Sequence, residues 1–275
     1  MTDIEFEPGT PPPGVVDDDH RLATWTATVA GDLLVQVRGQ GLEGKELKDS
    51  GDQAAHVLLM RLFAEHRPDD AVLSEESSES IADKTRLQAK RVWIIDPLDG
   101  TREFSEPPRD DWAVHVALWQ RDEDGGHGEL VAGAVAQPGL STTFNTGEPP
   151  VVPPRTSERP RIAVSRTRPP AFVAGLAEEL GAELVPMGSA GAKVISVVRD
   201  VTDAYVHAGG QYEWDSAAPI AVARAAGLHT SRADGAKLEY NQDDVLLPDL
   251  LVCRPELADQ ITGFVRRYWS ENPPE

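Results

Sequence analysis

Apolar side chains recur at the spacing of a helix in two stretches near the N-terminus. In residues 22–37 they return every three or four positions, and Gly39 then predicts the end of a first helix. In residues 55–63 the same spacing predicts a second helix, which begins after Gly51 and ends before Pro68. The chain therefore begins with a predicted pair of helices.

Short apolar runs follow the two helices and predict strands. They cover residues 71–73, 92–95, 113–119 and 131–136. Consecutive strands after two helices predict α+β layering with antiparallel pairing. The second half of the chain alternates strands at 162–165, 184–185, 204–207 and 250–253 with helices at 172–180, 191–199 and 217–226. This alternation predicts an α/β layer packed on the first unit.

The proline-rich stretch 148–154 is the best candidate for a domain boundary, because consecutive prolines stiffen a connection and cannot donate to a β-ladder. A chain of 275 residues is long enough for two compact units. We therefore predict an N-terminal α+β domain over 20–150 and a C-terminal α/β domain over 151–275. Residues 1–19 are rich in proline and acid, which predicts a flexible arm.

Composition excludes several classes of partner. The formal net charge of −20 argues against a nucleic-acid binder, although metal ions would let an acidic protein bind a small anion. No run of about 20 apolar residues predicts a membrane span. The acidic start is unlike a signal peptide, and the single cysteine, Cys253, excludes an intrachain disulfide. We therefore expect a cytoplasmic protein that acts on a small molecule.

The predicted strand at 92–95 is followed by Asp96-Pro97-Leu98-Asp99-Gly100-Thr101. This segment is a candidate loop for binding a metal ion and a phosphate. A turn at the proline would let both carboxylates converge on one point, and carboxylate oxygens suit Mg²⁺. Gly100 leaves room for a phosphate to approach the backbone, and a helical turn from Thr101 would favour an anion. The alternative is an ordinary surface turn, because Asp-Pro and Asp-Gly are common turn sequences.

Two further acidic segments lie in favourable positions. Glu75 and Glu76 end one predicted strand as Asp96 ends the next, so their carboxylates would meet at one sheet edge if the strands are neighbours. Asp215 precedes a predicted Ala-rich helix, where an aspartate either caps free N–H groups or ligates a metal. The alternatives for these segments are an acidic loop and a helix cap.

The order of these motifs resembles that of the lithium-inhibited, magnesium-dependent phosphomonoesterases of the inositol monophosphatase superfamily, over nearly the whole chain after the arm. Residues 99–104 and 188–193 are similar to its 3′(2′),5′-bisphosphate nucleotidase branch, and residues 109–115 and 207–210 resemble actinobacterial enzymes of sulfate assimilation. The resemblance implies a layered αβαβα sandwich, the inositol monophosphatase and fructose-1,6-bisphosphatase-like fold.

The resemblance also implies a metal site for two Mg²⁺ ions. The first ion would be held by Glu75, Asp96 and the Leu98 carbonyl, and the second by Asp96, Asp99 and Asp215. Glu75 and Thr101 would orient the attacking water. Asp52 would hold a weaker third ion or accept a proton through Thr101, although it follows Ser50-Gly51 where the family usually has Thr-Ala.

Substrate contacts are implied in the same way. The implied set is Glu75, Leu98, Asp99, Gly100, Thr101, Ser189, Lys193 and Asp215. The backbone of residues 98–101 would cradle the scissile phosphate, and Lys193 would contact a second phosphate with help from Ser189. Without the resemblance, Lys193 is equally well interpreted as a surface lysine. His207 is interpreted as structural, and the arginine-rich stretch 155–168 either as surface charge or as a basic rim.

The implied reaction is hydrolysis of adenosine 3′,5′-bisphosphate to AMP and phosphate by metal-activated water, with 3′-phosphoadenylyl sulfate as a second substrate. One alternative is an inositol monophosphatase or fructose-1,6-bisphosphatase of broad specificity. Another is a non-catalytic, metal-dependent nucleotide sensor. A haloacid-dehalogenase type of phosphatase is disfavoured because two residues, rather than one, separate Asp96 from Asp99. The oligomeric state is left open, with a homodimer as one hypothesis.

Overall fold

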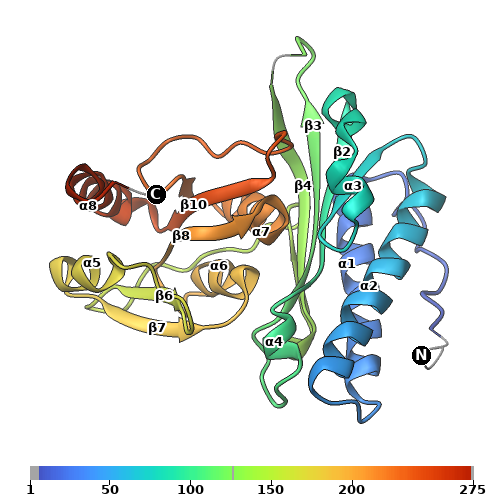
Figure 1. The fold of residues 1–275 in the computed structure, drawn as a ribbon, viewed down its shortest axis with the longest axis horizontal. Helices are drawn as coiled ribbons and strands as arrows, with labels where there is room; N and C mark the ends of the chain where they lie inside the picture. The colour runs from blue at the N-terminus through green and yellow to red at the C-terminus, as the bar shows by residue number, and fades with distance from the viewer. Residues whose placement is uncertain (1–5, 126, 274–275) are drawn as a thin grey trace.

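The computed structural model describes residues 6–125 and 127–273, which form five alternating layers of helices and sheets (Figure 1). The outer helices on one side are α1 (Asp19–Arg38) and α2 (Gly44–His66). The first sheet has the order β1-β2-β3-β4-β5, with bounds Ala71–Ser74, Arg91–Asp99, Ala113–Arg121, Gly128–Gln137 and Thr142–Asn145. The shorter α3 (Ser78–Ala82) and α4 (Thr101–Phe104) flank this sheet.

The middle helices, α6 (Ala190–Val198) and α7 (Glu213–Ala225), separate the two sheets. The second sheet has the order β7-β6-β8-β10-β9, with bounds Glu183–Met187, Arg161–Ser165, Ala204–Tyr212, Leu246–Cys253 and His229–Ser231. Its outer face is covered by α5 (Val173–Leu180) and α8 (Ala258–Glu271). The predicted αβαβα sandwich is therefore confirmed.

Alternation along the strands explains how the layers pack. In β2, Trp93 and Ile95 belong to the core shared with α1 and α2, whereas Val92 and Ile94 belong to the core shared with α6 and α7. Successive side chains of a strand point to opposite faces, so a strand covered on both faces reads as a continuous apolar run. This is the physical reason why residues 92–95 were recognisable as a strand.

The first two strands pair in parallel, and the prediction of antiparallel pairing is wrong for them. Parallel neighbours need a crossover connection, and residues 75–90 provide one with α3 and the short 3₁₀ helix at Lys84–Gln88. Strands β2 to β5 are antiparallel as predicted. Because β1 and β2 run in the same direction, their ends lie together, which places Glu75 beside Asp96.

Helix α2 begins at Gly44, earlier than predicted, and Gly51 lies inside it. The first turns are largely polar and exposed, so the apolar periodicity does not reveal them. A Cβ on Gly51 would lie 2.7 Å from Cε1 of Phe104 in α4, so the glycine permits a close approach of the two helices. That approach brings the next residue, Asp52, to the end of β2.

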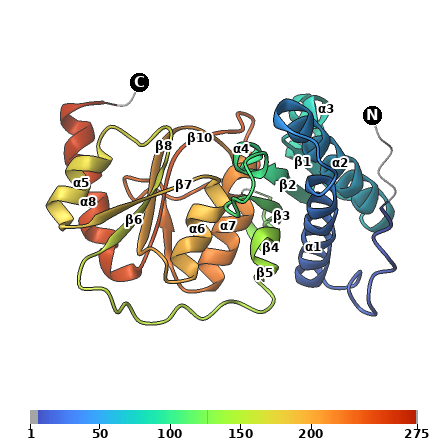
Figure 2. The same ribbon diagram turned by 90° about the horizontal axis from the view of Figure 1, so that it is seen from below.

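The two sheets are joined by an extended connection over residues 146–160, which runs along one side of the molecule (Figure 2). The domain limits predicted around residue 150 and the mobility of the arm stay predictions. Residues 1–5 of that arm lie outside the described residues, and Val15 is buried against the first core. Among the described helices, none has the length and apolar character needed to cross a membrane.

Candidate active site

A β-bulge at the end of β2 turns two aspartates to the same side. Asp96 pairs with His115 of β3 and Asp99 pairs with Ala113, so two β2 residues lie opposite the single residue Val114. In a regular strand, residues three apart point to opposite faces. The additional residue removes this mismatch. Both acids therefore converge from within an irregular strand, rather than from the turn that the sequence predicted.

The converging carboxylates belong to Asp96, Asp99 and Asp215, each of which offers an oxygen atom within 4.8 Å of the others. Asp215 is the third residue of α7, not the residue before the helix as predicted. Its Oδ2 accepts a hydrogen bond from the backbone N–H of Tyr212 at 2.6 Å, so it also caps that helix. The structure thus brings together acids that lie more than 100 residues apart in sequence.

Asp96 is nearly inaccessible, with 1% of its surface exposed, and it has few compensating donors. Its Oδ1 accepts the N–H of Leu98 at 3.0 Å, whereas Oδ2 has no hydrogen-bond partner within the described part of the chain. Burial and the neighbouring carboxylates of Glu75 and Asp99 raise the pKa of Asp96 well above its usual range. An unpartnered, buried carboxylate oxygen is a strong attractor for a cation.

Glu75 and Asp215 are also acids whose pKa values are raised by burial and by neighbouring carboxylates. Burial, followed by repulsion from Asp215, raises the pKa of Glu75 to about 8. Burial and repulsion from Asp99 raise the pKa of Asp215 to about 6. Without a cation the acids repel one another, and bound protons or metal ions relieve that repulsion.

Asp99 lies in the opposite environment. Its carboxylate accepts hydrogen bonds from the Ser189 hydroxyl (2.5 Å) and from the backbone N–H groups of Ala190 (3.1 Å) and Gly191 (2.6 Å). Burial alone would raise the pKa of Asp99, but His115 and the Ser189 hydroxyl together lower it to about 2. Asp99 of the first half therefore caps the beginning of α6 in the second half.

The loop after Asp99 is shaped by Gly100, whose φ is +84°. A Cβ there would also lie 3.2 Å from the Asp111 carbonyl oxygen, so glycine satisfies both the backbone and the space. Helix α4 begins at Thr101 as predicted, and the first N–H groups of a helix lack acceptors within it. The Thr101 hydroxyl lies 3.2 Å from the Leu98 carbonyl oxygen and 3.3 Å from Oδ1 of Asp52.

Asp52 is positioned to exchange a proton with this hydroxyl. Burial and the nearby charge of Glu76 raise the pKa of Asp52 to about 7, although the hydrogen bond from Thr101 works against this rise. A carboxyl group with a pKa near neutrality both accepts and releases a proton at physiological pH. The hydrogen bond between Thr101 and Asp52 is therefore present, while proton transfer through it stays a prediction.

Ser189 and Lys193 are close to the acids but are already engaged. The Ser189 hydroxyl donates to Asp99 and accepts the N–H of Ala192 at 2.9 Å. The Lys193 ammonium donates to the carbonyl oxygens of Gly188 (3.1 Å) and Ser189 (2.5 Å), and only 5% of the residue is exposed. Lys193 is thus a buried residue and not a surface lysine, while its contact with a second phosphate stays a prediction.

Sequence reasoning missed the role of His115. This residue is fully buried in β3, with Nδ1 3.0 Å from the Trp214 carbonyl oxygen and Nε2 3.2 Å from Oδ2 of Asp99. A histidine inside the otherwise apolar run 113–119 was the available signal.

Part of the arginine-rich stretch 155–168 is paired within the protein, because Arg166 donates to Glu103 at 2.6 Å.

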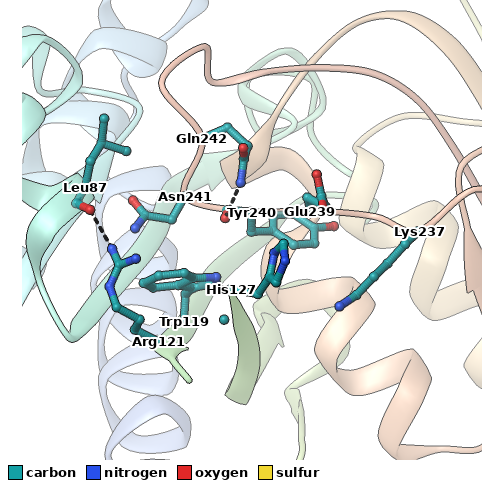
Figure 3. A pocket seen from close by; sticks show the side chains of 10 residues that line it. Leu87, Trp119, Arg121, His127, Lys237, Glu239, Tyr240, Asn241 and Gln242 are labelled. Carbon is teal, nitrogen blue, oxygen red and sulfur yellow. Dashed lines mark hydrogen bonds between the residues drawn. The ribbon is translucent and has the colours of Figure 1, made fainter. Parts of the chain in front are cut away.

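A polar cavity of about 290 Å³ lies at the other end of the first sheet, between the β3–β4 hairpin and the connection before β10 (Figure 3). Its cations are paired within the protein. The Arg121 guanidinium donates to the Leu87 carbonyl and lies 5.1 Å from the centre of the Trp119 ring. Lys237 forms an ion pair with Glu129 at 2.5 Å. Nothing in this arrangement assigns a ligand to the cavity.

The layered fold and the buried acid cluster define a class of metal-dependent phosphatases. The chain belongs to the inositol monophosphatase family, whose sequence profile matches residues 25–269. The acid cluster at the end of β2 fits the metal dependence of this family.

Within this family, the chain is similar to phosphatases from two mycobacteria. The chain is 48% identical to the 3′-phosphoadenosine 5′-phosphate phosphatase of Mycobacterium leprae (strain TN) over 259 residues, which cover 91% of this chain and 94% of the relative. It is 50% identical over 248 residues to the protein of the same name from Mycobacterium tuberculosis (strain CDC 1551 / Oshkosh), covering 87% and 90%. Among solved structures, inositol monophosphatase II of Staphylococcus aureus MSSA476 matches with a TM-score of 0.69 and 21% identity, covering 86% and 91%.

Proposed function

We propose that this chain is a Mg²⁺-dependent phosphomonoesterase that removes the 3′-phosphate of adenosine 3′,5′-bisphosphate, giving AMP and phosphate. The observation that carries the proposal is the convergence of Asp96, Asp99 and Asp215 within 4.8 Å. The two mycobacterial relatives are named for this substrate, and they match the chain over most of their length. We propose 3′-phosphoadenylyl sulfate as a second substrate because it carries the same 3′-phosphate.

The acids fit a divalent cation with oxygen ligands. Oδ2 of Asp96 is buried and unpartnered, and the pKa values of Glu75 and Asp215 are raised by uncompensated charge. Mg²⁺ prefers carboxylate, carbonyl and water oxygens in octahedral geometry. We propose that Glu75, Asp96 and the Leu98 carbonyl hold a first ion. Asp96, Asp99 and Asp215 would hold a second, with Asp52 near a weaker third.

Each proposed ligand keeps a lone pair for this role. The Leu98 carbonyl accepts the Thr101 hydroxyl, and a carbonyl oxygen has a second lone pair. Asp99 accepts one hydrogen bond on Oδ1, which leaves the other Oδ1 position open. Bound Mg²⁺ would neutralise charge on the phosphate and make a nearby water more acidic.

The protein's own groups handle the proton and the phosphate. The Thr101 hydroxyl relays a proton from the attacking water to Asp52, whose pKa of about 7 suits a general base. Glu75 orients the same water. The free N–H groups at the beginning of α4, reached through Gly100, hold the oxygens of the scissile phosphate.

We propose that Lys193 and Ser189 support the second phosphate of the substrate. An ammonium group has three donors, and Lys193 uses two of them on the carbonyl oxygens of Gly188 and Ser189. The Tyr205 ring lies 5.2 Å from the ammonium nitrogen, and we propose that the third donor and the positive charge serve an anion. Ser189 holds the beginning of α6 in place through Asp99 and thus fixes the loop that carries these groups.

A test compares phosphate release from adenosine 3′,5′-bisphosphate, inositol 1-phosphate and fructose 1,6-bisphosphate, with and without lithium. The proposal predicts a clear preference for the nucleotide, with AMP as the nucleotide product. Preference for inositol phosphate would reject the substrate while retaining the chemistry. Binding of the nucleotide with Mg²⁺ but without release of phosphate would identify a sensor instead. Trapping of a phosphorylated Asp96 would reject direct attack by water.

We also propose a cytoplasmic location, supported by the single cysteine, Cys253, which is buried and unpaired in β10. The homodimer stays a hypothesis. Size-exclusion chromatography with light scattering tests it directly.

A further inference from the structure

We propose that His115 is a positioning residue that holds the Asp99 loop and the beginning of α7 at a fixed separation, and that Gly191 is glycine because the imidazole needs its space. The inference rests on the proposed metal-dependent phosphatase function. It adds a residue pair that contacts the acids from behind, outside the predicted ligand set.

The imidazole of His115 bridges segments from both halves of the chain. Nδ1 lies 3.0 Å from the carbonyl oxygen of Trp214, the residue just before Asp215. A carbonyl oxygen only accepts hydrogen bonds, so Nδ1 is the donor, and this bond fixes the orientation of the ring. Nε2 then lies 3.2 Å from Oδ2 of Asp99, although it is not aligned for a hydrogen bond. Nδ1 also lies 3.9 Å from Oδ2 of Asp96. The ring therefore lies between Asp99 and the backbone just before Asp215, and it also approaches Asp96.

The second half of the chain encloses this ring. The N–H of Gly191 donates to Oδ2 of Asp99 at 2.6 Å, so α6 closely approaches the same carboxylate oxygen that faces the ring. A Cβ on Gly191 would lie 2.0 Å from Nε2 of His115 and 3.1 Å from Oδ2 of Asp99. Real Cβ atoms essentially never approach another atom this closely, so an alanine would force the ring or the helix to move.

Glycine at position 191 serves space rather than backbone conformation. The residue lies inside α6 and is not among the glycines with positive φ, so an alanine would fit the backbone and favour the helix. The preference of a helix for alanine is therefore overruled by the imidazole. Because His115 is fully buried and packed on all sides, it has no room to turn away.

The consequence for function is geometric. Groups that orient metal ligands from behind typically change metal affinity or activity by about 10- to 100-fold when they are removed. Loss of the imidazole leaves Asp99 and Asp215 free to shift relative to each other. Addition of a methyl group at position 191 pushes the two segments apart. Each single substitution disturbs the site. In the double variant, the methyl group at position 191 occupies space that the imidazole of His115 has left.

The test is mutual suppression between His115→Ala and Gly191→Ala in the full chain, read by Mg²⁺ affinity in titration calorimetry. We expect Gly191→Ala to weaken Mg²⁺ binding by about tenfold or more and His115→Ala by a similar factor. The double variant should bind Mg²⁺ at least about threefold more tightly than Gly191→Ala alone, because neighbouring substitutions couple. A double variant equal to or weaker than Gly191→Ala would overturn the proposal.

The thermal unfolding midpoint in chelator gives a second readout that needs neither metal nor substrate. The double variant should be more stable and accumulate in higher soluble yield than Gly191→Ala, even if that single variant fails to fold. Equal or lower stability would contradict the pairing. Gly263→Ala in α8 is the matched control, because its Cβ would lie 3.7 Å from Nη1 of Arg267, an ordinary contact. It should leave Mg²⁺ affinity unchanged.

These readouts separate two kinds of failure. Suppression in metal affinity without hydrolysis of adenosine 3′,5′-bisphosphate would reject the proposed substrate and support the pairing of His115 with Gly191. Hydrolysis of the nucleotide without suppression would support the enzyme and reject the pairing.

Discussion

Asp96 and Asp99 belong to the same six-residue motif, yet the protein treats their charges in opposite ways. Asp96 has one oxygen without a partner, and burial with neighbouring acids raises its pKa. Asp99 receives hydrogen bonds from Ser189, Ala190 and Gly191, and its pKa falls to about 2. One side of the motif is poor in donors, and the other side is rich in them.

The difference separates two roles within one loop. On the Asp96 side, the fold tolerates uncompensated charge, which destabilises the protein until a cation binds. On the Asp99 side, the carboxylate connects the first half of the chain to α6 and stabilises the fold. Strain that is retained at a functional site and relieved by a ligand is a common feature of enzymes.

Asp96→Asn, on the donor-poor side of the motif, should cause the largest loss of activity among the variants considered. Loss of a charge that stabilises the reacting phosphate removes several kcal/mol, so the rate of phosphate release should fall by about 10³-fold or more. The same substitution removes repulsion and should raise the unfolding midpoint of the metal-free protein. Steady-state kinetics and calorimetry in chelator measure both effects. Retained activity, or a lower midpoint, would contradict the assignment.

Asp52→Asn tests the proton relay beside the motif. Removal of a general base typically reduces the rate by about 10²-fold or more, and the loss should appear in kcat rather than in affinity for the first two Mg²⁺ ions. Thr101→Val should behave similarly because it removes the hydroxyl between Asp52 and the Leu98 carbonyl. Thr101→Ser keeps that hydroxyl and serves as the control. A large loss of activity in the serine variant would argue against a relay.

Asp99→Asn should affect the donor-rich side through stability. The neutral amide weakens the charge-assisted hydrogen bonds at the beginning of α6, which should reduce the free energy of unfolding by about 1–3 kcal/mol. The metal-free midpoint should therefore fall, opposite in sign to the effect of Asp96→Asn. Denaturant titration in chelator measures the change. Two variants that shift in the same direction would remove the contrast between the two acids.

Mg²⁺ affinity should depend on pH, because some of the acids that would bind the metal have raised pKa values. The pKa values of Glu75 and Asp215 are raised to about 8 and about 6, so these groups hold protons that a metal must displace. Mg²⁺ affinity should fall as pH decreases from about 8 towards 6, by up to about tenfold per pH unit for each displaced proton.

The raised pKa values of Glu75 and Asp215 also determine how the stability of the metal-free protein changes with pH. Because the folded pKa values exceed the unfolded ones, this contribution to metal-free stability is full at acid pH and is lost as pH rises through 6 to 8. Asp215→Asn should make both dependences shallower. Affinities that do not change over this range would contradict the raised pKa values.

The cavity at the opposite end of the sheet provides the smallest expected effect. Lys237→Gln breaks the exposed ion pair with Glu129, and such pairs contribute about 0–1 kcal/mol. Activity and Mg²⁺ affinity should therefore change by less than about twofold. A large loss of activity would show that the two ends of the sheet are coupled.

Much of the site was predictable because its acids follow recognisable elements. Apolar runs before Glu75 and Asp96, together with the Ala-rich helix at Asp215, located the four principal acids, because Asp99 belongs to the same motif as Asp96. The layered fold also followed, through resemblance and strand patterning. The parallel pairing of β1 with β2 was missed because it depends on the crossover at 75–90 rather than on either strand. Strands β5 and β9 and helix α8 were missed as well.

The remaining features depend on contacts between the two halves. Nothing in the local sequence around Ser189 and Lys193 shows that their polar groups bind within the protein. The His115 imidazole acquires its role only when Trp214 and Gly191 approach from the second half. The bulge at Pro97-Leu98 similarly arises from the pairing of β2 with β3. Local patterns locate chemical groups, whereas tertiary approach determines which of them stay free to act.

The central claim is that uncompensated carboxylates around Asp96 drive removal of the 3′-phosphate from a nucleotide. The most direct measurement is the release of phosphate and AMP from adenosine 3′,5′-bisphosphate by the wild-type chain and by Asp96→Asn, each in Mg²⁺ and in chelator. We expect rapid release only for the wild-type chain in Mg²⁺. Equal release in chelator, or by the Asp96→Asn variant, would contradict this claim.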